Sequence, residues 1–166
     1  MSKIKLLLLL MIGLHLFRSN AQEVESTTYN WMLKALLSHT VKEINVKEAV
    51  EKNEALFVDS REKEEYEVSH IKDAVFVGYN NLKLKPLNSI EKSREIIVYC
   101  SVGYRSEKVA EKLFKMGFTD VKNLYGGIFE WKNQGFPVWN DAEETEKVHA
   151  YDKKWGIWLK KGEKVY

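Results

Sequence analysis

The single cysteine of the chain, Cys100, lies where a strand pattern changes into a helix pattern. Residues 96–99 are Ile-Ile-Val-Tyr, which predicts a strand buried on both faces. From Ser106 onward apolar residues recur at helical spacing, until Gly117 ends the pattern. Cys100 is therefore expected in a loop that leads from the carboxyl end of a strand into a helix N-terminus. Free backbone N–H groups and the helix dipole favour an anion there, so we expect a nucleophilic thiolate.

The loop itself supplies further groups that could act on a bound anion. Gly103 fits a turn with positive φ, which would direct backbone N–H groups inward. Arg105 is expected to stabilise an anionic substrate, with pairing to a surface acid as the alternative. Tyr104 is expected to shape the entry to the pocket. The alternative for Cys100 is a small buried hydrophobic residue, but its position between strand and helix favours the reactive thiolate.

Residues 100–106, Cys-Ser-Val-Gly-Tyr-Arg-Ser, resemble the active-site loop of the rhodanese family of sulfurtransferases. The resemblance extends from about Ile44 to Trp139. It is specific because further motifs occur in order. These are Asp59-Ser60-Arg61, Glu65-Tyr66, Ser69-His70-Ile71, Asp73-Ala74, Met116-Gly117-Phe118, Asn123-Leu124-Tyr125-Gly126-Gly127-Ile128, Trp131, Gly135 and Pro137. The resemblance implies that the loop cysteine accepts a sulfane sulfur and becomes a persulfide.

Carried to this chain, the resemblance assigns the persulfide to Cys100 and an anion-stabilising side chain to Arg105. The residues whose backbone would hold the anion are Ser101, Val102, Gly103, Tyr104 and Arg105. The expected supporting residues are Asp59, Arg61 and Ser106. For Asp59 and Arg61, capping and mutual pairing that hold loops are favoured over a place in the site. His70 is expected to be buried or capping, because a thiolate at a helix N-terminus needs no base.

Strand and helix patterns alternate along the chain, which predicts an α/β fold. Predicted strands are 44–45, 55–58, 74–77, 96–99 and 121–124, and predicted helices are 27–37, 46–52, 61–68, 106–116 and 128–131. Right-handed crossovers then give a rhodanese-like parallel sheet of about five strands, covered by helices on both faces. The carboxyl ends of these strands would gather Asp59, Gly78-Tyr79-Asn80, Cys100 and Tyr125-Gly126 at one edge of the sheet.

Two extensions flank the predicted rhodanese-like domain, residues 44–139. The N-terminal extension, 22–43, is expected to contain a helix that packs on the domain through Trp31, Met32, Ala35 and Leu36. In the C-terminal extension, 140–166, apolar segments 155–159 and 165–166 flank a glycine-containing turn and predict a hairpin. Its aromatic content favours packing on the domain over disorder. The alternative is a surface that docks a protein partner.

Residues 1–21 have the pattern of a cleaved signal peptide. Lys3 and Lys5 precede an apolar run over 6–17, and small residues end at Ala21. This run is shorter than the roughly 20 residues that span a bilayer, which disfavours the alternative of an uncleaved membrane anchor. We therefore expect a periplasmic or secreted protein with no membrane contact after cleavage. Loss of residues 1–21 removes three basic residues and no acid, changing the formal net charge from +2 to −1. Such a balance indicates no nucleic-acid partner.

One cysteine excludes an internal disulfide and a dithiol mechanism within the chain. The four histidines, His15, His39, His70 and His149, show no metal-ligand spacing, so neither a metal nor a cofactor is expected.

The leading hypothesis is a sulfurtransferase that moves sulfur through Cys100 to a thiol or cyanide. Its partners would be a small-molecule or protein sulfur donor and a thiol acceptor. Ser101 and Val102 are uncharged where several relatives carry basic residues, which favours a persulfide donor over doubly charged thiosulfate. A non-catalytic rhodanese-like binding module is the alternative. A cysteine phosphatase is disfavoured, because the loop between Cys100 and Arg105 is one residue shorter than in those enzymes.

Overall fold

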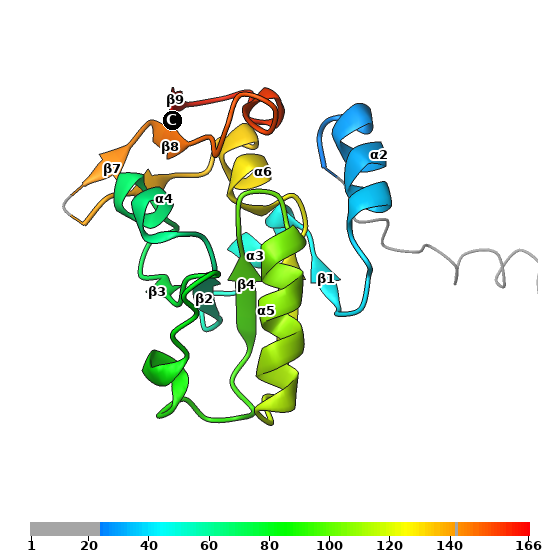
Figure 1. The fold of residues 1–166 in the computed structure, drawn as a ribbon, viewed down its shortest axis with the longest axis vertical. Coiled ribbons are helices and arrows are strands. Elements are labelled where there is room, and N and C mark those ends of the chain that lie inside the picture. The colour runs from blue at the N-terminus through cyan, green and yellow to red at the C-terminus, as the bar shows by residue number, and fades with distance from the viewer. Residues whose placement is uncertain (1–23, 142) are drawn as a thin grey trace, which may run out of the picture.

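The computed structural model describes residues 24–141 and 143–166, so the predicted signal peptide lies outside the described residues. The sheet has five parallel strands in the order β1-β5-β4-β2-β3. Figure 1 labels β3, β2, β4 and β1 of this sheet from left to right. The strands are β1 (Glu43–Ile44), β2 (Leu56–Asp59), β3 (Val75–Phe76), β4 (Ile96–Tyr99) and β5 (Val121–Leu124). The predicted α/β fold with a five-stranded parallel sheet is confirmed.

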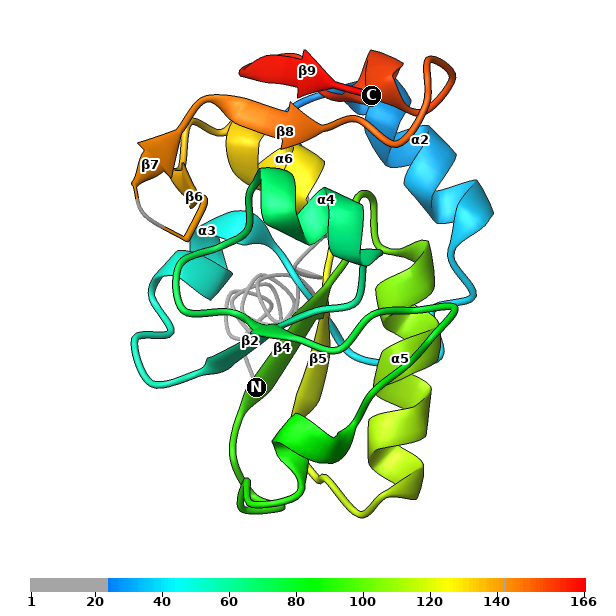
Figure 2. The same ribbon diagram turned by 60° about the vertical axis from the view of Figure 1, so that its left-hand side comes forward.

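Strand β4 lies in the middle of the sheet, and all four of its residues are buried. Ile97 and Tyr99 belong to a core with helices α3 (Val46–Val50) and α6 (Gly127–Asn133). Ile96 and Val98 face the other side and pack with helix α5 (Tyr104–Lys115). Because successive strand residues point to opposite faces, one apolar run supplies both cores. The predicted covering of both faces is visible in Figure 2, where α3 and α5 lie on opposite sides.

Helix α2 (Thr27–Leu36) packs on the domain as predicted, but the most buried part of its surface is not the predicted one. Tyr29 and Leu33 are fully buried, whereas Trp31 is 73% exposed. The Tyr29 ring stacks on Trp158 with 5.2 Å between centroids, and its hydroxyl donates to the Gly126 carbonyl oxygen at 2.8 Å. The buried face is therefore set by contacts with distant residues. The apolar pattern of the helix offers two neighbouring stripes. Of the predicted stripe, Met32 and Leu36 do pack against the core, whereas Trp31 and Ala35 are exposed, so the prediction was wrong for two of its four residues.

The predicted C-terminal hairpin between 155–159 and 165–166 was also wrong. Strand β6 (Val138–Trp139) pairs antiparallel with β7 (Glu144–Thr145), and β8 (Lys147–His149) pairs parallel with β9 (Glu163–Val165). Residues Gly156–Trp158 form a 3-10 helix instead of a strand. The carboxylate of Asp152 accepts the N–H groups of Lys154 and Trp155, which turns this stretch into a helical turn.

The C-terminal segment packs against α6 and α2. Val148, Ala150 and Leu159 are fully buried in the same core as Tyr29 and Leu33. The Asn133 amide at the end of α6 donates to the Trp158 carbonyl oxygen at 2.9 Å and accepts the Lys160 N–H at 2.6 Å. Both extensions consequently lie together at one end of the molecule (Figure 2).

Two short helices complete the fold, α4 (Lys63–Val68) after β2 and a 3-10 helix (Lys85–Leu87) between β3 and β4. Within the part of the chain that the structure describes, no helix has both the length and the apolar character to cross a membrane.

Candidate active site

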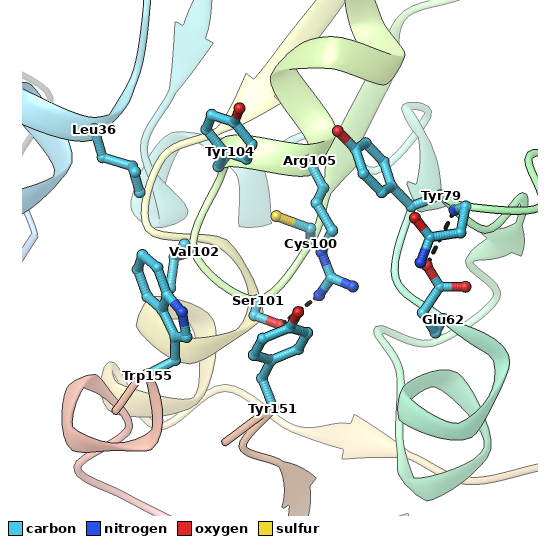
Figure 3. Close-up of a pocket in the computed structure, with 11 residues that line it drawn as sticks. Leu36, Glu62, Tyr79, Cys100, Ser101, Val102, Tyr104, Arg105, Tyr151 and Trp155 are labelled. Atoms are coloured by element: carbon cyan, nitrogen blue, oxygen red, sulfur yellow. Dashed lines mark hydrogen bonds between the residues drawn. The ribbon is translucent and has the colours of Figure 1, made fainter. Parts of the chain in front are cut away.

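Cys100 lies next to a cavity of about 320 Å³ at the carboxyl end of β4 (Figure 3). Its Sγ accepts a hydrogen bond from the Gly103 N–H at 3.1 Å. Helix α5 begins at Tyr104, so its N-terminus meets the thiol as the sequence predicted. One part of the lining, the loop side, consists of Cys100, Ser101, Val102, Tyr104 and Arg105. The other lining residues are Leu36, Glu62, Tyr79, Asn80, Tyr151 and Trp155.

The carbonyl groups of the loop are bound by α6. The Cys100 carbonyl oxygen accepts the Ile128 N–H at 2.9 Å, and that of Ser101 accepts the Phe129 N–H at 3.1 Å. In a planar trans peptide, the next N–H points opposite to the carbonyl. The N–H groups of Ser101 and Val102 are therefore directed away from α6. This arrangement suits a negatively charged sulfur.

Gly103 has the predicted positive φ, 120°. Its carbonyl oxygen accepts a hydrogen bond from the Asn123 amide at 3.0 Å and lies 3.0 Å from the Ser106 hydroxyl oxygen. The Ser106 hydroxyl oxygen is also 2.7 Å from the Asn123 amide oxygen. Ser106 and Asn123 thus hold the turn that brings the Gly103 N–H to Sγ. Asn123 belongs to the rhodanese-like motifs, but its spacing in the sequence gave no sign of this role.

Arg105 lines the cavity but is engaged by an acid. Its two terminal nitrogens donate to the Glu65 carboxylate at 2.6 and 2.7 Å, and Nη2 also donates to the Ser101 hydroxyl oxygen at 2.9 Å. The Ser101 hydroxyl in turn donates to Glu65 at 2.9 Å. In Figure 3 the guanidinium lies beside Ser101 and Tyr151. Arg105 is thus paired with an acid, but the acid is buried and not on the surface as the alternative in the sequence analysis had it. The pair ties α4 to the loop.

The Glu65 carboxylate is stabilised in its charged form. Burial by itself would raise its pKa, but the hydrogen bonds and charge of Arg105, with the charge of Arg61, lower the pKa to about 2. Burial by itself would lower the pKa of Arg105. The interaction with Glu65 outweighs burial, so the pKa of Arg105 is raised. Both side chains are therefore charged at neutral pH, and each neutralises the other.

Asp59 and Arg61 do not line the cavity. Both side chains are completely buried, and the Arg61 guanidinium donates to the Asp59 carboxylate at 2.7 Å and to the Ser69 carbonyl oxygen at 2.6 Å. The backbone N–H of Arg61 also donates to the Asp59 carboxylate at 2.9 Å. The two residues hold the chain between β2 and α4, the arrangement that the sequence analysis favoured.

Other residues expected at the strand ends have different positions. Tyr79 and Asn80 line the cavity, whereas Tyr125 and Gly126 do not. His70 is buried, with Nδ1 3.1 Å from the Tyr66 carbonyl oxygen, and is not among the lining residues. Among residues 24–141 and 143–166, no group of three or more His, Cys, Asp or Glu side chains could hold a metal ion.

Sequence reasoning missed Leu36, Tyr151 and Trp155 as cavity residues. They form the part of the lining that we call the extension side. The aromatic content of the C-terminal extension was a signal, but it did not show which rings reach the site. Glu65 was also missed, because a motif does not show which acid pairs with Arg105.

Residues 44–134 match the family described as Rhodanese-like domain. The chain belongs to this family. A solved rhodanese-like domain protein from Staphylococcus aureus is 29% identical, with a TM-score of 0.52 over 61% of this chain and 99% of that one. The thiosulfate sulfurtransferase from Pseudomonas aeruginosa shares the fold, with a TM-score of 0.56 at 21% identity over 66% of this chain and 22% of that one.

Curated relatives are longer proteins. A tRNA uridine(34) hydroxylase from Yersinia pestis is 31% identical over an alignment of 113 residues that covers 63% of this chain and 32% of that protein. The rhodanese-like chain thus spans about a third of the length of the curated relatives it matches. Its Leu36, Tyr151 and Trp155 lie outside the residues that match the family.

Proposed function

We propose that this rhodanese-like protein is a sulfurtransferase in which Cys100 carries the transferred sulfur as a persulfide. The observation that supports this most strongly is the position of Sγ. It lies beside a cavity, accepts the Gly103 N–H at 3.1 Å and faces the N-terminus of α5. Backbone N–H groups and the helix dipole stabilise negative charge on sulfur, so no histidine is needed to take a proton from the thiol.

In the first step, the Cys100 thiolate attacks the outer sulfur of the donor. A bond forms between Sγ and that sulfur, and the bond joining it to the rest of the donor breaks. The rest of the donor leaves with the electron pair. The new terminal sulfur carries the negative charge, and the inward N–H groups of Ser101, Val102 and Gly103 would stabilise it.

In the second step, a thiolate or cyanide acceptor attacks the terminal sulfur. The Sγ–S bond breaks, and Cys100 leaves as the thiolate with which the cycle began. No oxidant or reductant is consumed, because the sulfur atom moves from one nucleophile to another. The requirement for a single buried thiol fits a chain with one cysteine.

The short loop argues against phosphatase chemistry at the same thiol. Four residues separate Cys100 from Arg105. Each residue adds up to ~3.5 Å of chain and one N–H, so a shorter loop makes a smaller ring of donors. In addition, Arg105 is already bound by Glu65. A single sulfur atom suits this ring better than a phosphoryl group.

Thiocyanate formation from a sulfur donor and cyanide tests the proposal. The protein is expected to catalyse it, and Cys100→Ser is expected to reduce the rate to that of the uncatalysed reaction. Aryl phosphate hydrolysis is expected to be absent in both. Equal thiocyanate rates in the two proteins, or Cys100-dependent phosphatase turnover, would refute sulfur transfer as the function.

We also propose that the protein is exported to the periplasm or secreted. The support is the signal-peptide pattern of residues 1–21. The N-terminus of the protein recovered from an expressing bacterium provides the test. Gln22 is the expected first residue, and recovery of the chain with its uncleaved N-terminal segment would contradict export by cleavage.

A further inference from the structure

The extension side of the cavity has no counterpart within the residues that match the family. Leu36 comes from the end of α2, and Tyr151 and Trp155 come from the segment after β8. Figure 3 shows Leu36 and Trp155 on the side of the cavity toward which the Cys100 Sγ points, with Val102 and Tyr104 next to them. An incoming group bound beside the sulfur would therefore meet apolar and aromatic surface.

This surface is anchored before any substrate binds. The backbone N–H of Trp155 donates to the Asp152 carboxylate at 2.9 Å, and the next turn is fixed by the stack of Trp158 on Tyr29. The Tyr151 ring lies 5.1 Å from the Arg105 guanidinium carbon. A preformed apolar surface binds an apolar group at little cost in conformational entropy.

The charges around the cavity disfavour a doubly negative donor. The positive charge of Arg105 is matched by Glu65 at 2.6 Å. Glu62 also lines the cavity, where its carboxylate accepts the Asn80 N–H at 3.0 Å. Counted formally, Arg105, Glu65 and Glu62 give a net charge of −1 beside a thiolate. A second negative charge on the donor would be repelled and not compensated.

We propose that the extension side makes this protein selective for sulfur donors with an apolar, aromatic leaving group, in preference to thiosulfate. The inference rests on the proposed sulfur transfer and adds the class of donor. A cavity of about 320 Å³ accommodates a group of the size of a phenyl ring. The residues that determine the preference are Leu36, Tyr151 and Trp155.

Thiosulfonate anions, R–SO₂–S⁻, allow the preference to be measured with one reaction. The Cys100 thiolate attacks the outer sulfur, the S–S bond of the donor breaks, and the sulfinate R–SO₂⁻ leaves with the electron pair. Benzenethiosulfonate and methanethiosulfonate carry the same charge and differ only in the apolar group. Thiosulfate has a negatively charged oxygen in place of that group.

The wild-type protein is expected to use benzenethiosulfonate with a kcat/KM roughly tenfold to a hundredfold higher than methanethiosulfonate, the range for one buried apolar group. Thiosulfate should be slower than both. Trp155→Ala and Tyr151→Ala should each reduce the ratio of the two thiosulfonates by roughly fivefold or more. Tyr151 is 49% exposed, so its variant is expected to fold even if Trp155→Ala does not. The matched control is Trp31→Ala on α2, which removes a tryptophan that does not line the cavity.

The outcomes separate this inference from the function on which it rests. Failure of every donor to place sulfur on Cys100 would refute the proposed function and the inference with it. Transfer from all three donors at similar rates, or fastest transfer from thiosulfate, would refute the inference alone. The inference alone would also be refuted if the ratio of kcat/KM for benzenethiosulfonate to that for methanethiosulfonate were equal in wild type, Tyr151→Ala and Trp31→Ala.

Discussion

The loop side and the extension side of the cavity are stabilised by different interactions. On the loop side, Cys100 and Ser101 are fixed through their backbone carbonyls by α6, and Arg105 is fixed by a buried acid. On the extension side, Trp155 packs against the apolar core, and the Tyr151 ring, which is 49% exposed, lies 5.1 Å from the Arg105 guanidinium carbon. Under the proposed function, the loop side sets the chemistry and is expected to tolerate little change. Under the further inference, the extension side sets the choice of donor and is expected to tolerate change without loss of the reaction.

An insertion into the loop provides the largest expected effect. Adding one glycine between Val102 and Gly103 would displace the Gly103 N–H from Sγ, a contact of 3.1 Å. Loss of an oriented donor to a developing negative charge costs about a hundredfold to a thousandfold in rate. We expect sulfur transfer to Cys100 to slow by about a thousandfold, because the inserted residue also moves Arg105. The rate of persulfide formation is the measurement.

A glycine inserted between Asn53 and Glu54, in an exposed turn, is the control for this insertion. It should leave the rate within about threefold, since the turn lies outside the cavity lining. If both insertions had equal effects, the loop side would not have the special role assigned to it.

Removing the acid that holds Arg105 is expected to cost stability. Glu65→Gln leaves a largely buried guanidinium, whose side chain is 13% exposed, without its counter-ion. Breaking such a pair costs about 3 kcal/mol in the free energy of unfolding, measured by urea denaturation. Glu67→Gln on the same helix is the control. Its partner Lys63 is 71% exposed, so we expect a loss below about 0.5 kcal/mol. Comparable losses for the two variants would contradict the account.

The stability difference between wild type and Glu65→Gln should depend on pH. The Glu65 pKa is lowered from 4.5 to about 2 in the folded protein. A carboxyl with a depressed pKa contributes its full stabilisation above the ordinary value and loses it as pH falls through the folded value. Unfolding measured from neutral pH to about pH 2 should show a constant difference above 4.5 and a shrinking one below it. If the stability difference between wild type and Glu65→Gln did not decline in acid, the charge of Glu65 would not be the source of that difference.

The close packing of Gly127 against the backbone of the Cys100 loop predicts the next largest loss of stability. A Cβ at Gly127 would lie 2.4 Å from the Cys100 carbonyl oxygen, and the residue has φ of 57°. Gly127→Ala should reduce the free energy of unfolding by about 2 to 3 kcal/mol through overpacking and backbone strain. Gly117→Ala is the control, because Gly117 also has a positive φ, 90°, but a Cβ there would meet no atom within 4 Å. Its free energy of unfolding is expected to fall by about 1 kcal/mol. The measurement is thermal unfolding of the two variants. The prediction would be contradicted if Gly117→Ala were less stable than Gly127→Ala.

The smallest effect is expected on the extension side. Tyr151→Leu keeps an apolar side chain but removes the ring that lies 5.1 Å from the Arg105 guanidinium carbon. A partly exposed cation–π contact contributes about 0.5 to 1 kcal/mol. We expect a loss of stability in this range in urea denaturation. A loss above about 2 kcal/mol would show that the two sides do not differ in their tolerance.

What could be predicted from the sequence depended on local signals. The apolar run Ile96–Tyr99 predicts the central strand, and Gly103 predicts the turn with positive φ, because each depends on neighbouring residues alone. The pairing of Glu65 with Arg105 joins residues 40 positions apart, and periodicity contains no signal for such a partner. The motif order did identify the family, since several short signals occur together.

The errors have a common physical cause. The face of α2 was misassigned because Trp158, distant in sequence, stacks on Tyr29. The hairpin was misassigned because the Asp152 side chain captures the Trp155 N–H and starts a turn. In both places a distant or side-chain contact overrides the pattern of apolar residues. These same contacts place the extension side, which therefore could not be predicted.

The most direct test of the central claim is the intact mass of the mature protein after incubation with benzenethiosulfonate and removal of excess donor. The account predicts a gain equal to one sulfur atom, located on Cys100, which is lost again when cyanide is added. The Cys100→Ser protein should gain nothing. An unchanged mass in the wild type, or a one-sulfur gain that persists in Cys100→Ser, would contradict the assignment of Cys100 as the sulfur carrier.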